Sequence, residues 1–217
     1  MSTMARPAEL FYRERLAEGD PAGLLVLHHG RGADELDLLP LGHALDPQRR
    51  LHVVAPRAPL TLSGSPGYHW YVVPRVGYPE PETFRAAYRD LAAFHDELWR
   101  RFGLEAGRTV LGGFSMGSVM SYSLGLGYDR PAPAGILAFS GFIPTVEGWQ
   151  PEIPRSTDVF IAHGRSDPIM DVEFARIAKS LLEDSGMSVE YHESDVGHTI
   201  DPAAAEQAAD WLRRVIP

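Results

Sequence analysis

The stretch Val110–Ser118, written VLGGFSMGS, places three glycines and two serines directly after an apolar run. An apolar run followed by small residues predicts a buried strand that ends in a tight turn. Ser115 lies at the centre of that turn, with Gly113 two residues before it and Gly117 two residues after it. Side chains at the two glycine positions would collide with neighbouring backbone, so the pattern indicates a sharp strand-to-helix turn that presents the Ser115 hydroxyl.

The segments on both sides of this turn alternate between strand-like and helix-like patterns. We expect strands at 9–15, 23–29, 51–56, 108–113, 134–140, 158–163 and 188–193, and helices at 35–45, 82–102, 116–126, 171–185 and 202–215. The middle five strands are continuously apolar, which is typical of strands buried on both faces. The pattern predicts one α/β domain over residues 1–217, with a mostly parallel sheet between two layers of helices. Sites in such sheets lie beyond the carboxyl ends of the strands.

The composition argues against several classes of protein. With 44% hydrophobic and 23% charged residues, the 217-residue chain has the make-up of a globular protein. A net charge of −9 disfavours binding to nucleic acid or stable association with an anionic membrane. The chain has no cysteine, which rules out a disulfide, a thiolate nucleophile and a cysteine-based zinc site. No run is long and apolar enough for a leader or a membrane span, so we expect a cytoplasmic protein.

A serine hydroxyl attacks an ester at neutral pH only when a base removes its proton and an acid orients that base. In the G-x-S-x-G turn the expected chain order is serine, acid, histidine. Asp167 follows the strand expected at 158–163, and His198 follows the strand expected at 188–193. Taken alone, Asp167 also fits a turn before proline and His198 fits a surface histidine. Together with the turn, they predict Ser115 as nucleophile, Asp167 as acid and His198 as base.

The loop GRGAD at 30–34 follows the strand expected at 23–29 and is rich in small residues. Backbone N–H groups in such a loop can approach a substrate oxygen closely, so we expect the amides of Arg31 and Met116 to form an oxyanion hole. A phosphate-binding loop is the competing interpretation, but the loop lacks the third glycine and the G-K-[ST] sequence that such loops carry. The Arg31 side chain is either solvated or positioned to meet an acidic group on a substrate, and we assign it no catalytic role.

The walls of the site are expected from aromatic residues on the loops that follow strands. We expect Trp70, Tyr71 and Phe142 to bind the substrate. The segment 141–157 is too short for a helical cap, which predicts an open site. We expect no metal and no cofactor, because the neighbouring His28 and His29 point to opposite faces of a strand and no HExxH sequence is present.

Five pieces of the chain, in order, resemble the bacterial phospholipase/carboxylesterase group of the α/β-hydrolase superfamily, relatives of the acyl-protein thioesterases. They are HGRGADELDLLPL from residue 29, VVAPRAPL from 53, GGFSMGS from 112, FIAHGRSDPIM from 160 and GHTI from 197. The resemblance implies an α/β-hydrolase fold without a large cap domain and a serine esterase with a Ser115–Asp167–His198 triad. It also implies that a homodimer is plausible. Met116 departs from the pattern, because the thioesterase relatives tend to carry glutamine there.

These observations predict a serine carboxylesterase that hydrolyses soluble short- to medium-chain acyl esters through an acyl-enzyme on Ser115. The expected partner is a small-molecule ester. The alternatives are a lysophospholipase or acyl-thioesterase, a peptidase or dienelactone-type hydrolase on the same fold, and a non-catalytic protein that binds a ligand and retains the turn for structural reasons.

Overall fold

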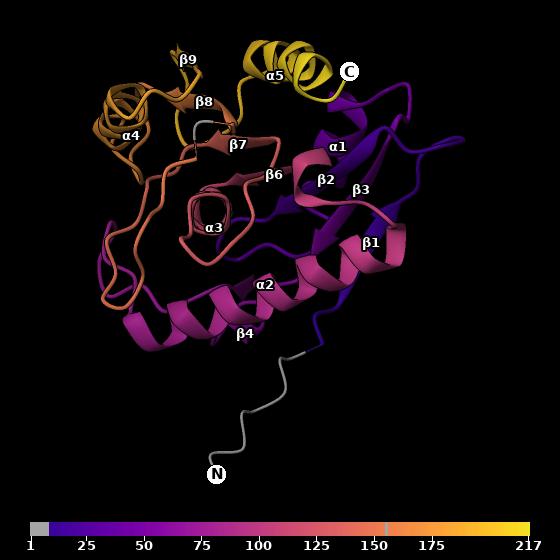
Figure 1. Ribbon diagram of the computed structural model, residues 1–217. Coiled ribbons are helices and arrows are strands. Elements are labelled where there is room, and N and C mark those ends of the chain that lie inside the picture. Colours follow the sequence, from indigo (N-terminus) through magenta and orange to yellow (C-terminus); the bar gives the residue numbers. More distant parts are fainter. Residues whose placement is uncertain (1–8, 155) are drawn as a thin grey trace.

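The computed structural model describes residues 9–154 and 156–217. Its main sheet has seven strands in the order β1-β3-β2-β6-β7-β8-β9 (Figure 1). Their bounds are β1 (Tyr12–Arg15), β2 (Gly23–His28), β3 (Leu51–Pro56), β6 (Thr109–Phe114), β7 (Gly135–Phe139), β8 (Asp158–Gly164) and β9 (Val189–Ser194). The edge strand β1 pairs antiparallel with β3, and the other neighbours pair parallel. The prediction of a mostly parallel sheet is therefore confirmed.

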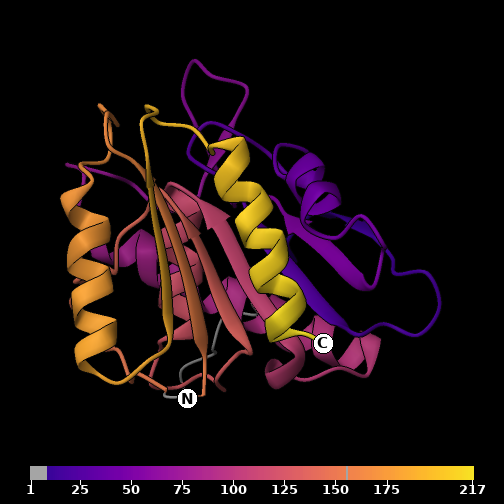
Figure 2. The same cartoon turned by 90° about the horizontal axis from the view of Figure 1, so that it is seen from above.

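Helices cover both faces of this sheet, as expected for parallel strands. The helices are α1 (Leu39–Leu45), α2 (Pro81–Phe102), α3 (Met116–Gly125), α4 (Glu173–Asp184) and α5 (Pro202–Val215). In Figure 1, α1 and α5 lie on one face and α2 and α3 on the other. Figure 2 shows α5 running in front of the strands. Among the described residues, no helix combines the length and the apolar character needed to cross a bilayer.

The two faces of the sheet explain why its central strands are apolar at every position. In β2, Leu24 and Val26 belong to the core cluster that also contains residues of α2, α3 and α4, whereas Leu25 and Leu27 belong to the cluster that contains residues of α1 and α5. Successive side chains of a strand point to opposite faces, so a strand between two helical layers needs apolar residues at both. Because β2, β6 and β8 run in the same direction, their carboxyl ends lie at the same edge of the sheet. The predicted site residues come directly after these strand ends.

The observed elements differ from the expected ones mainly at α1. The helix expected at 35–45 begins only at Leu39, because the preceding residues form turns and Asp34 accepts the backbone N–H of Leu36. Pro40 then sits in the first turn, where its missing N–H costs no hydrogen bond. The strand expected at 9–15 starts at Tyr12. The sequence reading also missed a 3₁₀ turn at Ala106–Arg108 and a two-stranded sheet of β4 (Leu60–Thr61) and β5 (Tyr68–His69).

A pair of buried histidines lies between β2 and α2. His28 Nδ1 lies 2.9 Å from Ser121 Oγ, and His28 Nε2 lies 3.3 Å from His95 Nε2. Ser121 donates its own proton to Gly117 O, so its oxygen accepts from His28 Nδ1–H and leaves His28 Nε2 to accept from His95. Burial and the neighbouring His29 lower the pKa of His28 to about 3, and burial holds the pKa of His95 well below its usual range. Both rings are therefore neutral in the folded protein.

This pair makes the fold sensitive to acid. Below about pH 6.5 the unfolded chain protonates both rings while the folded protein does not, so the free energy of unfolding falls by about 1.4 kcal/mol per pH unit for each histidine. Urea denaturation between pH 7.5 and 5 measures how steeply the free energy of unfolding falls with pH. This pH slope should be smaller in His95→Gln, which keeps a donor for His28, than in the unsubstituted protein. In the control His43→Gln, which removes an exposed histidine, the slope should stay that of the unsubstituted protein. Equal slopes for all three proteins would contradict the prediction.

Candidate active site

The turn at Ser115 joins β6 to α3 in the way that its glycines predict. Ser115 has φ of 54° and ψ of −119°, a conformation that residues with a side chain rarely adopt. A Cβ atom at Gly113 would lie 2.4 Å from the carbonyl carbon of Gly117, and one at Gly117 would lie 1.8 Å from His28 O. Glycine is therefore required at both positions, the first for the turn itself and the second for the contact of α3 with the end of β2.

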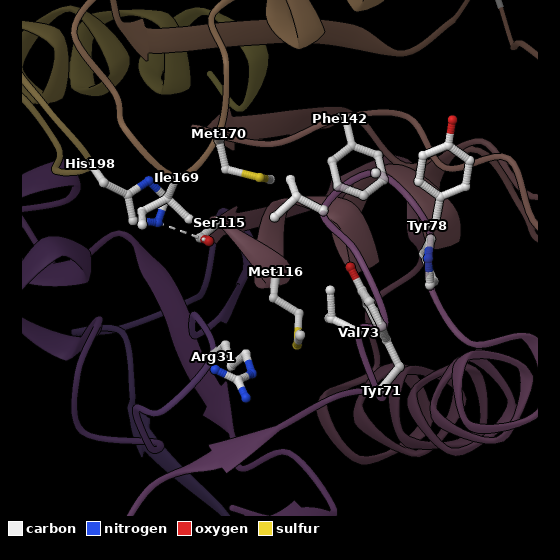
Figure 3. Close-up of a pocket in the computed structure, with 13 residues that line it drawn as sticks. Arg31, Tyr71, Val73, Tyr78, Ser115, Met116, Phe142, Ile169, Met170 and His198 are labelled. Carbon is white, nitrogen blue, oxygen red and sulfur yellow. Dashed lines mark hydrogen bonds between the residues drawn. The ribbon is translucent and has the colours of Figure 1, made fainter.

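The structure brings Ser115, His198 and Asp167 into one chain of hydrogen bonds. His198 Nε2 lies 3.0 Å from Ser115 Oγ, the contact drawn as a dashed line in Figure 3, and His198 Nδ1 lies 2.7 Å from Asp167 Oδ2. A carboxylate only accepts, so Nδ1 carries the proton and Nε2 is free to accept from the serine hydroxyl. The three side chains lie just after β6, β8 and β9, strands that are distant in sequence and whose carboxyl ends lie at the same edge of the sheet, with β7 between β6 and β8.

Asp167 is held as an ionised, oriented group. Its side chain is fully buried, and its Oδ1 accepts backbone N–H groups from Ile169 at 2.9 Å and Met170 at 2.8 Å. Burial alone would raise the pKa of Asp167, but the hydrogen bonds from Met170, His198 and Ile169 outweigh it and leave that pKa below its usual range. The carboxylate therefore keeps its charge and its orientation toward His198.

The buried His163 supports this acid, a role that the sequence reading missed. His163 Nε2 lies 2.8 Å from Met170 O and 3.6 Å from Asp167 Oδ2. It thus fixes the residue whose N–H binds the carboxylate. Its Nδ1 has no hydrogen-bond partner in the described part of the chain. The sequence analysis assigned no role to His163. Its position at the end of β8, four residues before Asp167, was the signal available.

The loop that precedes α1 is fixed next to the serine. Gly32 N donates to Tyr68 O at 2.8 Å, Tyr68 N donates to Ala33 O at 2.9 Å, and a Cβ atom at Gly67 would lie 1.8 Å from Gly32 O. Neither Arg31 N nor Met116 N donates to an acceptor among the described residues. Met116 is the first residue of α3, where N–H groups lack helical partners and attract negative charge. Both amides are available to a substrate oxygen.

A pocket of about 280 Å³ lies beside the serine and is lined in part by Ser115, Met116 and His198. The residues of its other walls are mostly apolar, and Figure 3 shows them extending from Ser115 toward Phe142 and Tyr78. They are Arg31, Tyr71, Val73, Val76, Gly77, Tyr78, Pro79, Phe142, Ile169 and Met170. Tyr71 and Phe142, two of the expected substrate-binding residues, thus lie in the wall. Across the described residues the chain places no large cap domain over this pocket.

The expectation for Trp70 is wrong. Its side chain is fully buried and does not line the pocket. Its ring N–H donates to His29 O at 2.8 Å, and its backbone N–H donates to Met116 Sδ at 3.3 Å. Trp70 and Tyr71 lie at a bend just after β5, and of the two only Tyr71 lines the pocket. Trp70 instead supports the loop and the helix that carry the two proposed oxyanion-binding amides.

Comparison with known proteins decides the family. The model of the Phospholipase/Carboxylesterase family matches residues 16–216, nearly the whole chain. The chain belongs to this family. The expected resemblance and the α/β-hydrolase fold are thereby confirmed, and the chain is an esterase or related hydrolase, since the relatives that it matches are named as esterases, hydrolases and acyl-protein thioesterases.

Individual members of the phospholipase/carboxylesterase family agree with this assignment. The chain is 29% identical over 199 residues to the putative hydrolase MhqD of Bacillus subtilis, covering 92% of this chain and 96% of that protein. It is 29% identical over 134 residues to acyl-protein thioesterase 1 of Neurospora crassa, covering 58% of this chain and 54% of that protein. The crystal structure of esterase PE8 superposes with a TM-score of 0.84 at 31% identity, over 96% of this chain and all of that one.

Proposed function

We propose that this protein is a serine carboxylesterase that hydrolyses soluble short- to medium-chain acyl esters through an acyl-enzyme on Ser115. The observation that supports the proposal most is the hydrogen-bond chain from Asp167 through His198 to Ser115, with distances of 2.7 and 3.0 Å. The base lies close enough to the nucleophile to take its proton, and the acid lies close enough to the base to orient it by a hydrogen bond. A protein that only binds a ligand has no need of this arrangement beside a pocket.

The proposed reaction has two half-reactions. His198 Nε2 takes the proton of Ser115 as Oγ attacks the ester carbonyl, and the N–H groups of Arg31 and Met116 bind the resulting oxyanion. The tetrahedral intermediate collapses, the bond to the alcohol breaks, and His198 gives its proton to the leaving oxygen. A water molecule then repeats the sequence on the acyl-enzyme, which releases the acid and restores Ser115. Asp167 stays ionised throughout and stabilises the imidazolium of His198.

The apolar end of the pocket sets the expected acyl preference. Each CH₂ buried against residues such as Tyr71 and Phe142 adds about 0.8 kcal/mol, or roughly fourfold in kcat/KM, until the pocket is full. Phenyl esters of increasing acyl length should therefore show kcat/KM rising and then falling, without a step at the solubility limit of the substrate. A rate that jumps only above that limit would contradict an open site, because it would signal activation at an oil interface.

The proposed function is tested by labelling and turnover together. A fluorophosphonate probe should form one covalent adduct, located on Ser115 by peptide mass spectrometry, and block hydrolysis of phenyl butyrate. Comparing phenyl butyrate with the matched thioester and anilide separates a carboxylesterase from an acyl-thioesterase and a peptidase. Folded protein that forms no adduct and hydrolyses none of the three would refute the proposal and favour a ligand-binding protein.

A further inference from the structure

Arg31 is a charged side chain in a pocket whose other walls are mostly apolar. The described residues that line the pocket include no other arginine and no lysine, aspartate or glutamate. Arg31 is exposed, and its guanidinium makes no ion pair or hydrogen bond with the described residues. By contrast, other exposed arginines, such as Arg165 and Arg176, pair with carboxylates. The guanidinium at the active site is therefore available to a ligand.

The carboxylates nearest to Arg31 in sequence do not neutralise it. Glu35 is bound by Arg57 through two hydrogen bonds of 2.6 and 2.7 Å. Asp34 accepts a backbone N–H of its own loop at 2.9 Å. Burial raises the pKa of Asp37, and the charged groups that act on Asp37 are those of His29 and Asp34. Three acidic residues, Asp34, Glu35 and Asp37, thus follow Arg31 closely in sequence without forming an ion pair with it.

The position of Arg31 indicates which part of an ester it would meet. In Figure 3, Arg31, Ser115 and His198 lie at one end of the pocket, and Phe142 and Tyr78 lie at the other. His198 must protonate the leaving oxygen, so the alcohol part of the ester occupies the end that holds His198, and the acyl chain occupies the apolar end. Arg31 therefore faces the alcohol part. Because its own amide is proposed to bind the oxyanion, its long side chain starts beside the ester bond and can extend over the alcohol part.

We infer that Arg31 selects esters whose alcohol part carries an anionic group, a carboxylate or a phosphate, close to the ester bond. This inference rests on the proposed function and adds to it the chemistry of the leaving group. A guanidinium offers paired N–H donors that match the oxygens of both groups. The net charge of −9 does not favour such substrates, so their recognition must come from this local contact.

The test uses three butyrate esters that differ only in the phenol: phenyl butyrate, 4-carboxyphenyl butyrate and 4-(phosphonooxy)phenyl butyrate. For each enzyme variant, kcat/KM for an anionic ester is divided by kcat/KM for phenyl butyrate. This ratio cancels any disturbance of the Arg31 amide. The unsubstituted enzyme should prefer at least one anionic ester by about fivefold, the size expected for an exposed charge-assisted contact. Whichever anionic ester is preferred identifies the group as carboxylate or phosphate.

The variants separate this contact from general electrostatics. The preference should disappear in Arg31→Gln, turn into discrimination against the anionic esters in Arg31→Glu, and weaken as salt is raised. The control Arg100→Gln removes the same charge from α2, where Arg100 pairs with Glu97, and should keep the preference. The inference is overturned if the ratios of the unsubstituted enzyme and Arg31→Gln agree for both anionic esters. If the unsubstituted enzyme still hydrolyses phenyl butyrate, that result would overturn only the role of Arg31 and not the proposed esterase function.

Discussion

Replacing Ser115 by alanine is expected to lower kcat for phenyl butyrate by at least about 10⁴-fold while leaving the fold intact. The hydroxyl supplies the atom that forms the acyl-enzyme, and nothing else in the pocket can replace it. Rate enhancement of about 10³ to 10⁴ over water can remain, because the amides of Arg31 and Met116 still bind the oxyanion. Alanine keeps the Cβ atom and the same backbone angles, so the thermal unfolding midpoint should change little.

Ser118 provides a matched control on the same helix. Its Oγ is buried and bonds to Gly113 O at 2.6 Å and Phe139 O at 2.8 Å, away from the pocket. Ser118→Ala should therefore lower the unfolding midpoint and retain turnover, the reverse of the Ser115→Ala result. Turnover by purified Ser115→Ala close to that of the unsubstituted protein would show that the nucleophile lies elsewhere.

Asp167→Asn is expected to lower kcat by about 10⁴-fold through the proton position on His198. The backbone N–H groups of Ile169 and Met170 point at one side-chain oxygen, so the amide oxygen takes that place and the NH₂ group faces His198 Nδ1. Because that NH₂ can only donate, Nδ1 must accept and the proton moves to Nε2. An Nε2 that already carries a proton cannot take the one from Ser115.

Asp195 is the competing acid, since it lies three residues before His198 in sequence. Its side chain is 88% exposed and pairs with Arg165 at 2.6 Å, both on the surface. Asp195→Asn should change kcat by less than about twofold, as is usual for an exposed ion pair. Steady-state kinetics on both variants, with unfolding midpoints as a check on folding, distinguishes the two residues. A large loss for Asp195→Asn and a small one for Asp167→Asn would reassign the acid.

The sequence predicted the site residues that depend on local steric rules or on strand ends. Gly113 and Gly117 could be recognised because the turn tolerates no side chain at either place. Asp167 and His198 could be placed because parallel strands bring their carboxyl ends to one edge. Both kinds of argument need only the order of elements along the chain, which an apolar pattern reveals.

The residues that were missed or misplaced depend on three-dimensional packing. Trp70 and Tyr71 are equally aromatic, and only the direction of the chain there decides which one faces the pocket. The role of His163 follows from the path of the chain after β8, which brings the Met170 carbonyl to its ring. The start of α1 was misjudged because Asp34 and the turns that follow it compete with the helix. A pattern of apolar residues contains none of this information.

The backbone of Ser115 has a consequence for how such a protein can change over time. A residue with a side chain held at φ of 54° is strained, and strain of this kind costs on the order of 1–3 kcal/mol. Glycine alone would relieve it, and glycine would also abolish the proposed chemistry. Selection for a more stable fold and selection for hydrolysis therefore act in opposite directions at this position. A descendant of this protein that no longer needs to hydrolyse esters would relieve this strain by replacing Ser115 with glycine.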